Sequence, residues 1–195
     1  MNQKFKIVSI DTLQSLRLFD EIDKFQDVTD ESIKDYMSYG VWVLFGYKEN
    51  ESWKCLQVGQ SNNIGTEILS DINCISGNIE IDTKRQYVNQ FGESVEGYVY
   101  HIYLTPREQI YSQIGTEYNG FIFVCICCGN NYKDNKRAIE KYVAWKFRAL
   151  FWRNGRAFKH PKKNINEPQD VGNIDPSIKD AVDVLVEQYN KQKLE

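Results

Sequence analysis

The segment GFIFVCICC, residues 120–128, is apolar almost throughout. A strand with one face in water alternates apolar and polar residues, whereas a strand covered on both faces needs no polar positions. We therefore expect this segment to be the central strand of a sheet with helices on both faces. Because helical and strand-like patterns are interleaved along the chain, the expected fold is a small α/β (α+β) domain with a mixed sheet.

The composition typical of strands recurs in three further segments, at residues 41–47, 53–59 and 97–105. A polar turn, KENES, separates the first two segments, which therefore predict a hairpin. A helix follows, starting at Asn62 or Asn63, both of which are good capping residues, and ending near Ile72. Residues 77–96 are polar, and we expect them to be irregular.

Helical periodicity precedes the first hairpin. An N-terminal helix is indicated by a stripe of apolar side chains, Leu13, Leu16, Phe19, Ile22 and Phe25. A second, short helix is expected between Thr29, which can cap its start, and Gly40, which would end it. Together these helices form an expected N-terminal helical extension over residues 1–37.

Two more helices are expected after the central strand. Asp134 can cap the first, whose apolar side begins at Ile139 and continues through Leu150 and Phe151. The second begins at Asp175, followed by Pro176 at the first helical position, where proline is favoured. We expect residues 161–195 to be a linker and a C-terminal helix that packs on the domain.

The cysteines and histidines give no sign of a metal or disulfide framework. Five cysteines are an odd number without regular spacing, and His101 and His160, the two histidines, lack metal-ligand spacing. We expect the cysteines to be small apolar residues on buried strands. The sequence has no apolar run long enough to cross a bilayer and no signal-peptide stretch at its start, so we expect a cytoplasmic protein without membrane contact.

Charge is distributed unevenly along the chain. The net charge is −3, yet residues 133–163 hold eleven Lys and Arg against two acids, Asp134 and Glu140. A basic block on a mildly acidic protein favours an anionic partner at one face. The other interpretation is a solvated helix face, which is common.

An ordered set of motifs resembles the GIY-YIG nuclease superfamily over residues 38–160. Gly40-Val41-Trp42 stands at the first name-giving tripeptide and Gln57-Val58-Gly59 at the second, followed by VGQSNNI. The later segment AIEKYVAWKFRALFWRNG is similar to the helix that carries the family's metal-binding glutamate, at Glu140. Asn154 matches the asparagine that many members place after that helix. The resemblance implies a GIY-YIG-like domain over 38–160, with the terminal helices as additions.

The sequence departs from the family's catalytic pattern at three positions. In the family, a divalent metal such as Mg²⁺ or Mn²⁺, held by the glutamate, activates phosphodiester hydrolysis. Trp42 replaces the tyrosine that is the usual candidate base, and an indole can only donate a hydrogen bond. Gln57 replaces the second tyrosine, and Glu67 stands where an arginine would face the phosphate. If the resemblance extends to the site, these three side chains and Glu140 should converge on one surface.

The remaining candidates each have a structural alternative. Glu140 can be a metal ligand, or it can pair with the lysines and arginine around it on a cationic helix. Asn154 precedes Gly155 and can simply end a helix. Cationic side chains on the helix and its exit are candidates for contacting nucleic acid: Arg137, Lys141, Arg148, Arg153, Arg156 and Lys159.

We therefore expect a nucleic-acid-associated domain, with DNA or RNA as its partner and with altered or lost phosphodiesterase chemistry. One alternative is an active metal-dependent endonuclease of the restriction or mobile-element type, with a rearranged site that uses Mg²⁺ or Mn²⁺. A second alternative is a protein-interaction module whose acidic flanks and terminal helices form the interface. A cofactor is expected only if the nuclease is active.

Overall fold

The computed structural model describes residues 3–11, 18–19, 28, 32–77, 81–88, 94–100, 106–127, 135–153, 156–157 and 168–192. Within these residues the strand order of the main sheet is β1-β6-β2-β3. The strands are β1 (Lys4–Ser9), β2 (Gly40–Tyr47), β3 (Lys54–Ser61) and β6 (Gly120–Cys127). β1 runs parallel to β6, while β2 is antiparallel to both of its neighbours, so the sheet is mixed.

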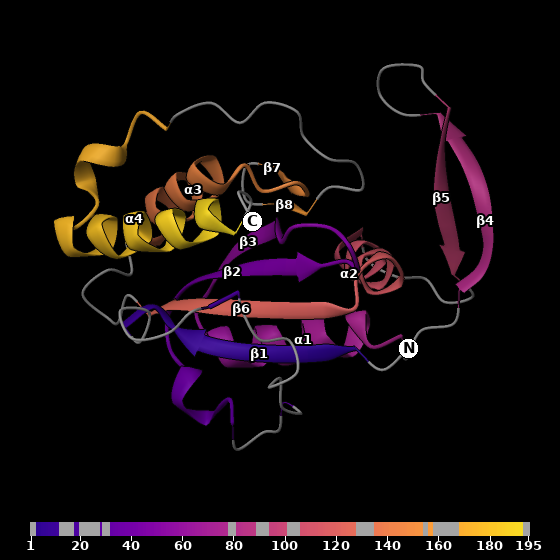
Figure 1. Ribbon diagram of the computed structural model, residues 1–195, viewed down its shortest axis with the longest axis horizontal. Helices are drawn as coiled ribbons and strands as arrows, with labels where there is room; N and C mark the ends of the chain where they lie inside the picture. Colours follow the sequence, from indigo (N-terminus) through magenta and orange to yellow (C-terminus); the bar gives the residue numbers. More distant parts are fainter. Residues whose placement is uncertain are drawn as a thin grey trace.

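The apolar segment at 120–128 is a central strand, as expected. β6 lies between β1 and β2, and its residues 121–126 are buried. Helices α1 (Ile64–Ile75) and α2 (Pro106–Glu117) cover one face of the sheet, and α3 (Lys136–Phe147) and α4 (Pro176–Lys191) cover the other (Figure 1). Short 3₁₀ turns form at η3 (Lys34–Tyr36) and η5 (Val171–Asn173). The α/β fold class is therefore confirmed.

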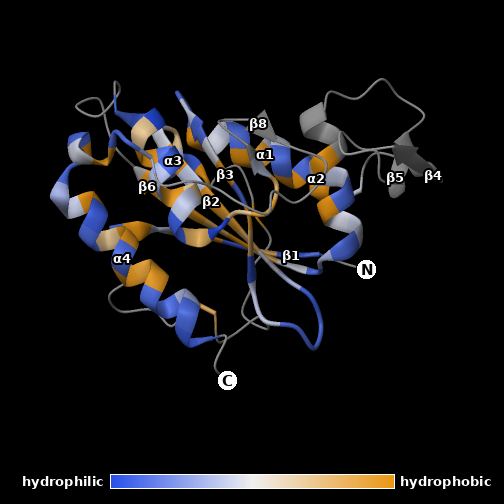
Figure 2. Cartoon of the chain, turned by 90° about the horizontal axis from the view of Figure 1, so that it is seen from above, coloured by the Kyte–Doolittle hydropathy of each residue, from blue (hydrophilic) through white to orange (hydrophobic). Residues whose placement is uncertain are grey.

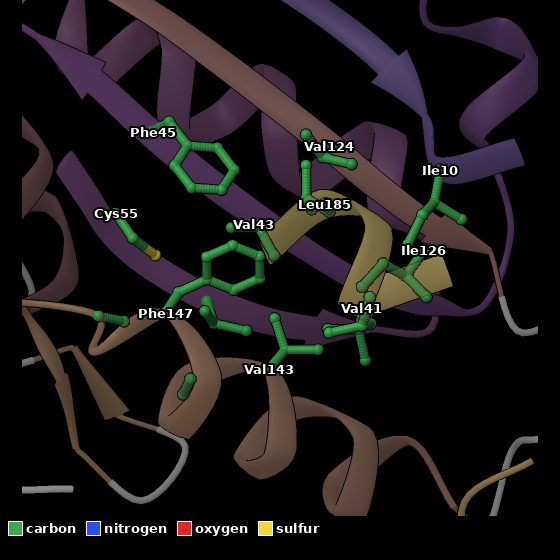
Figure 3. Close-up of a cluster of buried hydrophobic side chains, with 14 of the residues drawn as sticks. Ile10, Val41, Val43, Phe45, Cys55, Val124, Ile126, Val143, Phe147 and Leu185 are labelled. Atoms are coloured by element: carbon green, nitrogen blue, oxygen red, sulfur yellow. The ribbon is translucent and has the colours of Figure 1, made fainter. Parts of the chain in front are cut away.

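Two hydrophobic clusters lie on opposite faces of the sheet. We call the first the α3-side core; it includes Val43, Phe45, Phe147 and Leu185 (Figure 3). Tyr189 also belongs to it. We call the second the α1-side core; it includes Trp42, Leu44, Ile68, Tyr111 and Phe123. Each buried side chain of this size stabilises the fold by roughly 1.5–3 kcal/mol. Colouring by hydropathy shows the apolar side of α4 turned toward the sheet and the polar side turned away (Figure 2).

Two predicted helix starts are confirmed in detail. At α1, the Asn63 side-chain oxygen accepts a hydrogen bond from Thr66 N–H at 3.1 Å. At α4, Asp175 Oδ1 accepts from Ser177 N–H at 2.8 Å, with Pro176 in the first turn. Both caps satisfy amides that would otherwise lack partners, which is why such residues mark helix starts in a sequence.

The expected extent of the helix after the central strand was wrong at its end. α3 stops at Phe147, because Arg148 adopts a left-handed backbone conformation with φ of 54°. The chain then turns back, and the N–H groups of Leu150 and Phe151 donate to the carbonyls of Cys55 and Leu56 in β3 at 3.1 and 2.8 Å. These two residues therefore form a turn held against the edge strand β3 and do not continue the helix. Asp134, the expected cap, lies outside the described residues.

Several elements were not expected from the sequence. β1 occupies residues assigned to an N-terminal helical extension, and α2 falls where no helix was foreseen. The segment expected to be irregular contains most of a hairpin, β4 (Ile81–Val88) paired with β5 (Ser94–Tyr100), which stands beside the main sheet (Figure 1). A further pair of two-residue strands, β7 (Trp152–Arg153) and β8 (Arg156–Ala157), follows α3.

The predicted N-terminal helix over Leu13–Phe25 lies mostly outside the described residues, but Leu18 and Phe19 belong to the α3-side core. The domain boundaries at residues 38 and 160 stay predictions. Among the described helices, none is both long and apolar enough to span a membrane.

Candidate functional site

Trp42, at the first tripeptide, is a core residue of β2. Its side chain is 1% exposed and belongs to the α1-side core, where its ring lies 6.3 Å from Tyr111 and 5.8 Å from Phe123, centroid to centroid. Its indole nitrogen is buried and has no hydrogen-bond partner in the described part of the chain. The indole therefore contributes packing, and no water or substrate reaches it.

At Gly59, in the second tripeptide, the Trp42 indole leaves no room for a side chain. Gly59 pairs with Trp42 across the two strands, and a Cβ added at Gly59 would lie 2.4 Å from Trp42 Cζ2. Separations below 3.0 Å are essentially never found for real Cβ atoms. The glycine of the motif is thus explained by close packing, independently of any catalytic role.

Gln57 is also on the α1 side of the sheet. It pairs with Leu44, a member of the α1-side core, and its side chain is 3% exposed. Its Oε1 accepts a hydrogen bond from the Val58 backbone N–H at 3.0 Å. The amide oxygen is therefore engaged by the backbone of the edge strand.

Glu140 lies on the opposite side of the sheet. It comes from the buried side of α3, and its side chain is 3% exposed. Trp152 Nε1 donates to Glu140 Oε1 at 2.9 Å, and the Gln60 side chain lies close enough to lower the pKa of this carboxyl. Gln60 pairs with Val41 of the α3-side core, so the alternation of β3 directs it toward α3.

The environment of Glu140 favours its neutral form. Burial raises the pKa of this carboxyl above its ordinary value, and the negative charge of Glu67 raises it further. The hydrogen bond from Trp152, the charge of Arg137 and the Gln60 side chain act in the opposite direction, without cancelling the effect of burial. Glu140 is therefore a buried acid held by two side-chain partners.

The four motif positions do not meet on one surface. Trp42 and Gln57 are buried on the α1 side, whereas Glu140 is buried on the α3 side with Gln60. Glu67, in the first turn of α1, is half-buried and close enough for its charge to act on Glu140. Of the other three positions, Glu67 alone acts on Glu140, and it does so through its charge.

The basic candidates are only partly available to an anion. Arg137 and Arg148 are exposed. Lys141 Nζ lies 3.5 Å from Asp170 Oδ2, so its charge is already paired. Arg153 and Arg156 lie in β7 and β8, and the description of these two residues covers their backbone alone. Asn154 and Lys159 lie outside the described residues.

Lys136, Asn62 and Tyr39 form a group that the motif comparison did not single out. The Lys136 ammonium lies 5.4 Å from the centroid of the Tyr39 ring and hydrogen bonds to Asn62 Oδ1. The three residues come from the start of α3, the turn before α1 and the turn before β2. Lys136 lies in the basic block, directly before Arg137. That block was the sequence feature that pointed to this group.

Glu140 as the structure places it does not fit a divalent metal. Mg²⁺ keeps several of its waters when it binds a carboxylate in a protein, and a side chain that is 3% exposed leaves no room for them. One oxygen of the carboxyl also accepts the indole N–H of Trp152. Among the described residues, no group of three or more His, Cys, Asp or Glu side chains is arranged as a metal site.

Comparison with protein-family models, with curated proteins and with solved structures found no match.

Proposed function

We propose that this chain is a nucleic-acid-binding domain of GIY-YIG-like design that holds its ligand without hydrolysing it. The observation that carries the proposal is the placement of Glu140, buried beneath Trp152 and Gln60 while its neighbour Arg137 stays exposed on the same helix. The cation remains where an anion can reach it, and the acid is withdrawn from the surface.

The lost chemistry follows from the same arrangement. Hydrolysis would need a proton acceptor and an ionised carboxylate that both face the phosphate. Trp42 supplies no base and is enclosed in the core, and burial favours the neutral form of Glu140. Binding needs only cations and polar groups on the surface, which Lys136, Arg137 and Asn62 provide.

Binding and cleavage are to be measured side by side on the wild type and Glu140→Gln. We expect both proteins to bind DNA or RNA oligonucleotides at low salt, with affinity that falls as ionic strength rises. We expect neither protein to nick supercoiled plasmid in Mg²⁺ or Mn²⁺. Glu140→Gln is the informative variant, since it keeps the shape of the side chain and removes its ability to ionise.

Two results would change the conclusion. If no oligonucleotide binds at low salt, the nucleic-acid function is lost, and the protein-interaction alternative becomes the better one. If the wild type nicks plasmid and Glu140→Gln does not, Glu140 acts in an active endonuclease, and the burial of its carboxyl must be relieved when substrate and metal bind.

A further inference from the structure

We propose that Tyr39, Asn62 and Lys136 form a subsite for single-stranded nucleic acid. The inference rests on the proposed function and deepens it by naming the form of nucleic acid and the residues that contact it. In this subsite the Tyr39 ring stacks against a base, and Lys136, with Arg137 beside it, meets the adjoining phosphate.

The geometry of the subsite brings an aromatic ring and a cation together. The Lys136 ammonium stands 5.4 Å from the Tyr39 ring centroid, within the distance at which the ring attracts a cation. Asn62 Oδ1 accepts a second contact from the same ammonium, and Asn62 is exposed while Tyr39 and Lys136 are half-buried. Stacking faces next to cations are what single strands use on proteins that bind them.

The backbone holds the two turns of the subsite in fixed positions. Ile64 N–H donates to Ser38 O at 3.0 Å, which ties the turn before β2 to the start of α1. Ser61 Oγ accepts from Asn63 N–H at 3.0 Å and donates to Asn63 O at 2.9 Å, which fixes the turn that carries Asn62. These bonds and the Asn63 cap engage several amides at this end of α1, and Lys136 and Arg137 supply the positive charge for a phosphate.

The charge pattern favours a single strand over a duplex. A protein that makes roughly 6–10 phosphate contacts on duplex DNA needs a correspondingly large set of available cations. On α3, Lys141 is paired with Asp170 and Lys146 with Asp183, at 3.5 and 2.8 Å, so two of the four cations of this helix already have acidic partners. One ammonium at the ring, with Arg137 next to it in the sequence, suits one or two nucleotides whose bases are not already stacked in a helix.

The test measures binding by fluorescence anisotropy to single-stranded DNA, single-stranded RNA and duplex DNA of one sequence. We expect both single strands to bind at least about tenfold more tightly than the duplex, since only they offer an open base face. Tyr39→Leu should weaken single-strand binding by about 5- to 150-fold, and Tyr39→Phe should preserve it, because the ring is what stacks. Thermal melting of each variant verifies that it is folded.

Lys136→Gln tests the phosphate contact through the salt dependence of the binding affinity. For a single strand, each phosphate contact contributes about 0.7 to the slope of log affinity against log salt concentration, so this variant should lower the slope by about 0.7. Lys146→Gln is the matched control, because it removes the same charge from the same helix at a lysine that pairs with Asp183. It should leave both affinity and slope unchanged.

The failures of the two proposals are distinguishable. Tighter binding to the duplex, or single-strand binding that Tyr39→Leu leaves intact in a folded protein, would overturn the subsite and leave a nucleic-acid function standing. Absence of binding to all three probes would overturn both proposals. A preference for RNA or for DNA would identify the source of the strand and support the subsite in either case.

Discussion

The contact between Gly59 and Trp42 shows how one residue of a motif can be required for packing alone. An alanine at Gly59 would put its Cβ against the indole, and the core around Trp42 is closed on its other sides by Tyr111 and Phe123. We expect Gly59→Ala to lower the free energy of unfolding by about 1–3 kcal/mol, the usual cost of overpacking. Urea denaturation measures this difference.

A control and a rescue make this prediction specific. Gly172→Ala should have little effect, because an added Cβ at Gly172 meets nothing within 4 Å. Adding Trp42→Phe to Gly59→Ala should recover part of the loss, since the smaller ring leaves room for the methyl group. If Gly59→Ala is as stable as the wild type, the close approach described for this pair is wrong.

Glu140 makes stability depend on pH in a direction set by its burial. The folded protein retains this proton to a higher pH than the unfolded chain does, because the folded-state pKa is raised from 4.5. The free energy of unfolding therefore loses a contribution as pH rises from the ordinary carboxyl pKa to the raised one. Glu140→Gln keeps an oxygen for Trp152 and has no charge to bury, so it escapes this loss.

We expect the stability of Glu140→Gln relative to wild type to increase as the pH rises above 4.5, the ordinary carboxyl pKa, because only the wild type then has a charge to bury. Denaturant unfolding of both proteins at several pH values measures the difference. Glu187→Gln, at an exposed position of α4, is the matched control for the substitution itself. A difference between Glu140→Gln and wild type that stays constant with pH would show that Glu140 ionises normally in the folded protein.

How much of this site could be read from the sequence depends on how local each contact is. Glu140 stands out as an acid inside a basic block, and the sequence does contain both of its partners. Neither Gln60 nor Trp152 was linked to it, because Gln60 is 80 positions away and faces α3 only through the alternation of β3. Side chains brought together by tertiary packing leave no spacing that a motif can record.

At the scale of elements, the C-terminal end of α4 closes the start of the edge strand β3. Tyr189 Oη accepts from Cys55 N–H at 3.0 Å. Gln192 Oε1 accepts from Trp53 N–H at 2.9 Å, while its Nε2 donates to Trp53 O at 3.2 Å. The Gln192 amide thus bonds both the N–H and the carbonyl of Trp53, as a neighbouring strand would. This contact protects the edge of the sheet at this point from pairing with another chain.

This contact predicts a local change in hydrogen exchange. Tyr189→Phe removes the acceptor for Cys55 N–H, at a net cost of about 1 kcal/mol, so the Cys55 amide should exchange about fivefold faster. Asn190→Ala, at an exposed position of the same helix, is the control and should not change this rate. Unchanged exchange in Tyr189→Phe would mean that the hydroxyl does not protect this amide in solution.

The elements that could be predicted are those with local causes. The caps at Asn63 and Asp175 each depend on a bond two or three residues away, and β6 has a continuous apolar run. β1 lacked such a signal, since it is six residues long, it carries lysines at two positions, and its partner is distant in sequence. The helix predicted at α3 was too long, because the apolar spacing continues past Phe147. The left-handed backbone at Arg148 ends the helix there.

For the molecule as a whole, both ends of the described chain contribute to the main sheet or its core. β1 forms one edge of the sheet, and α4 adds Val182, Leu185 and Tyr189 to the α3-side core. Both lie outside the range 38–160 over which the GIY-YIG resemblance runs. The N-terminal and C-terminal segments are thus structural partners of the central region in the fold.

The parallel pairing of β1 with β6 has a consequence for how the protein is made. Lys4 pairs with Gly120, so these partners are 116 positions apart in the sequence. At a synthesis rate of about 5–20 residues per second, β1 leaves the ribosome roughly 6–23 s before its partner strand does. During that interval the nascent chain carries a strand whose partner has not yet been made. The two lysines of β1 are charges of the kind that oppose pairing with another chain.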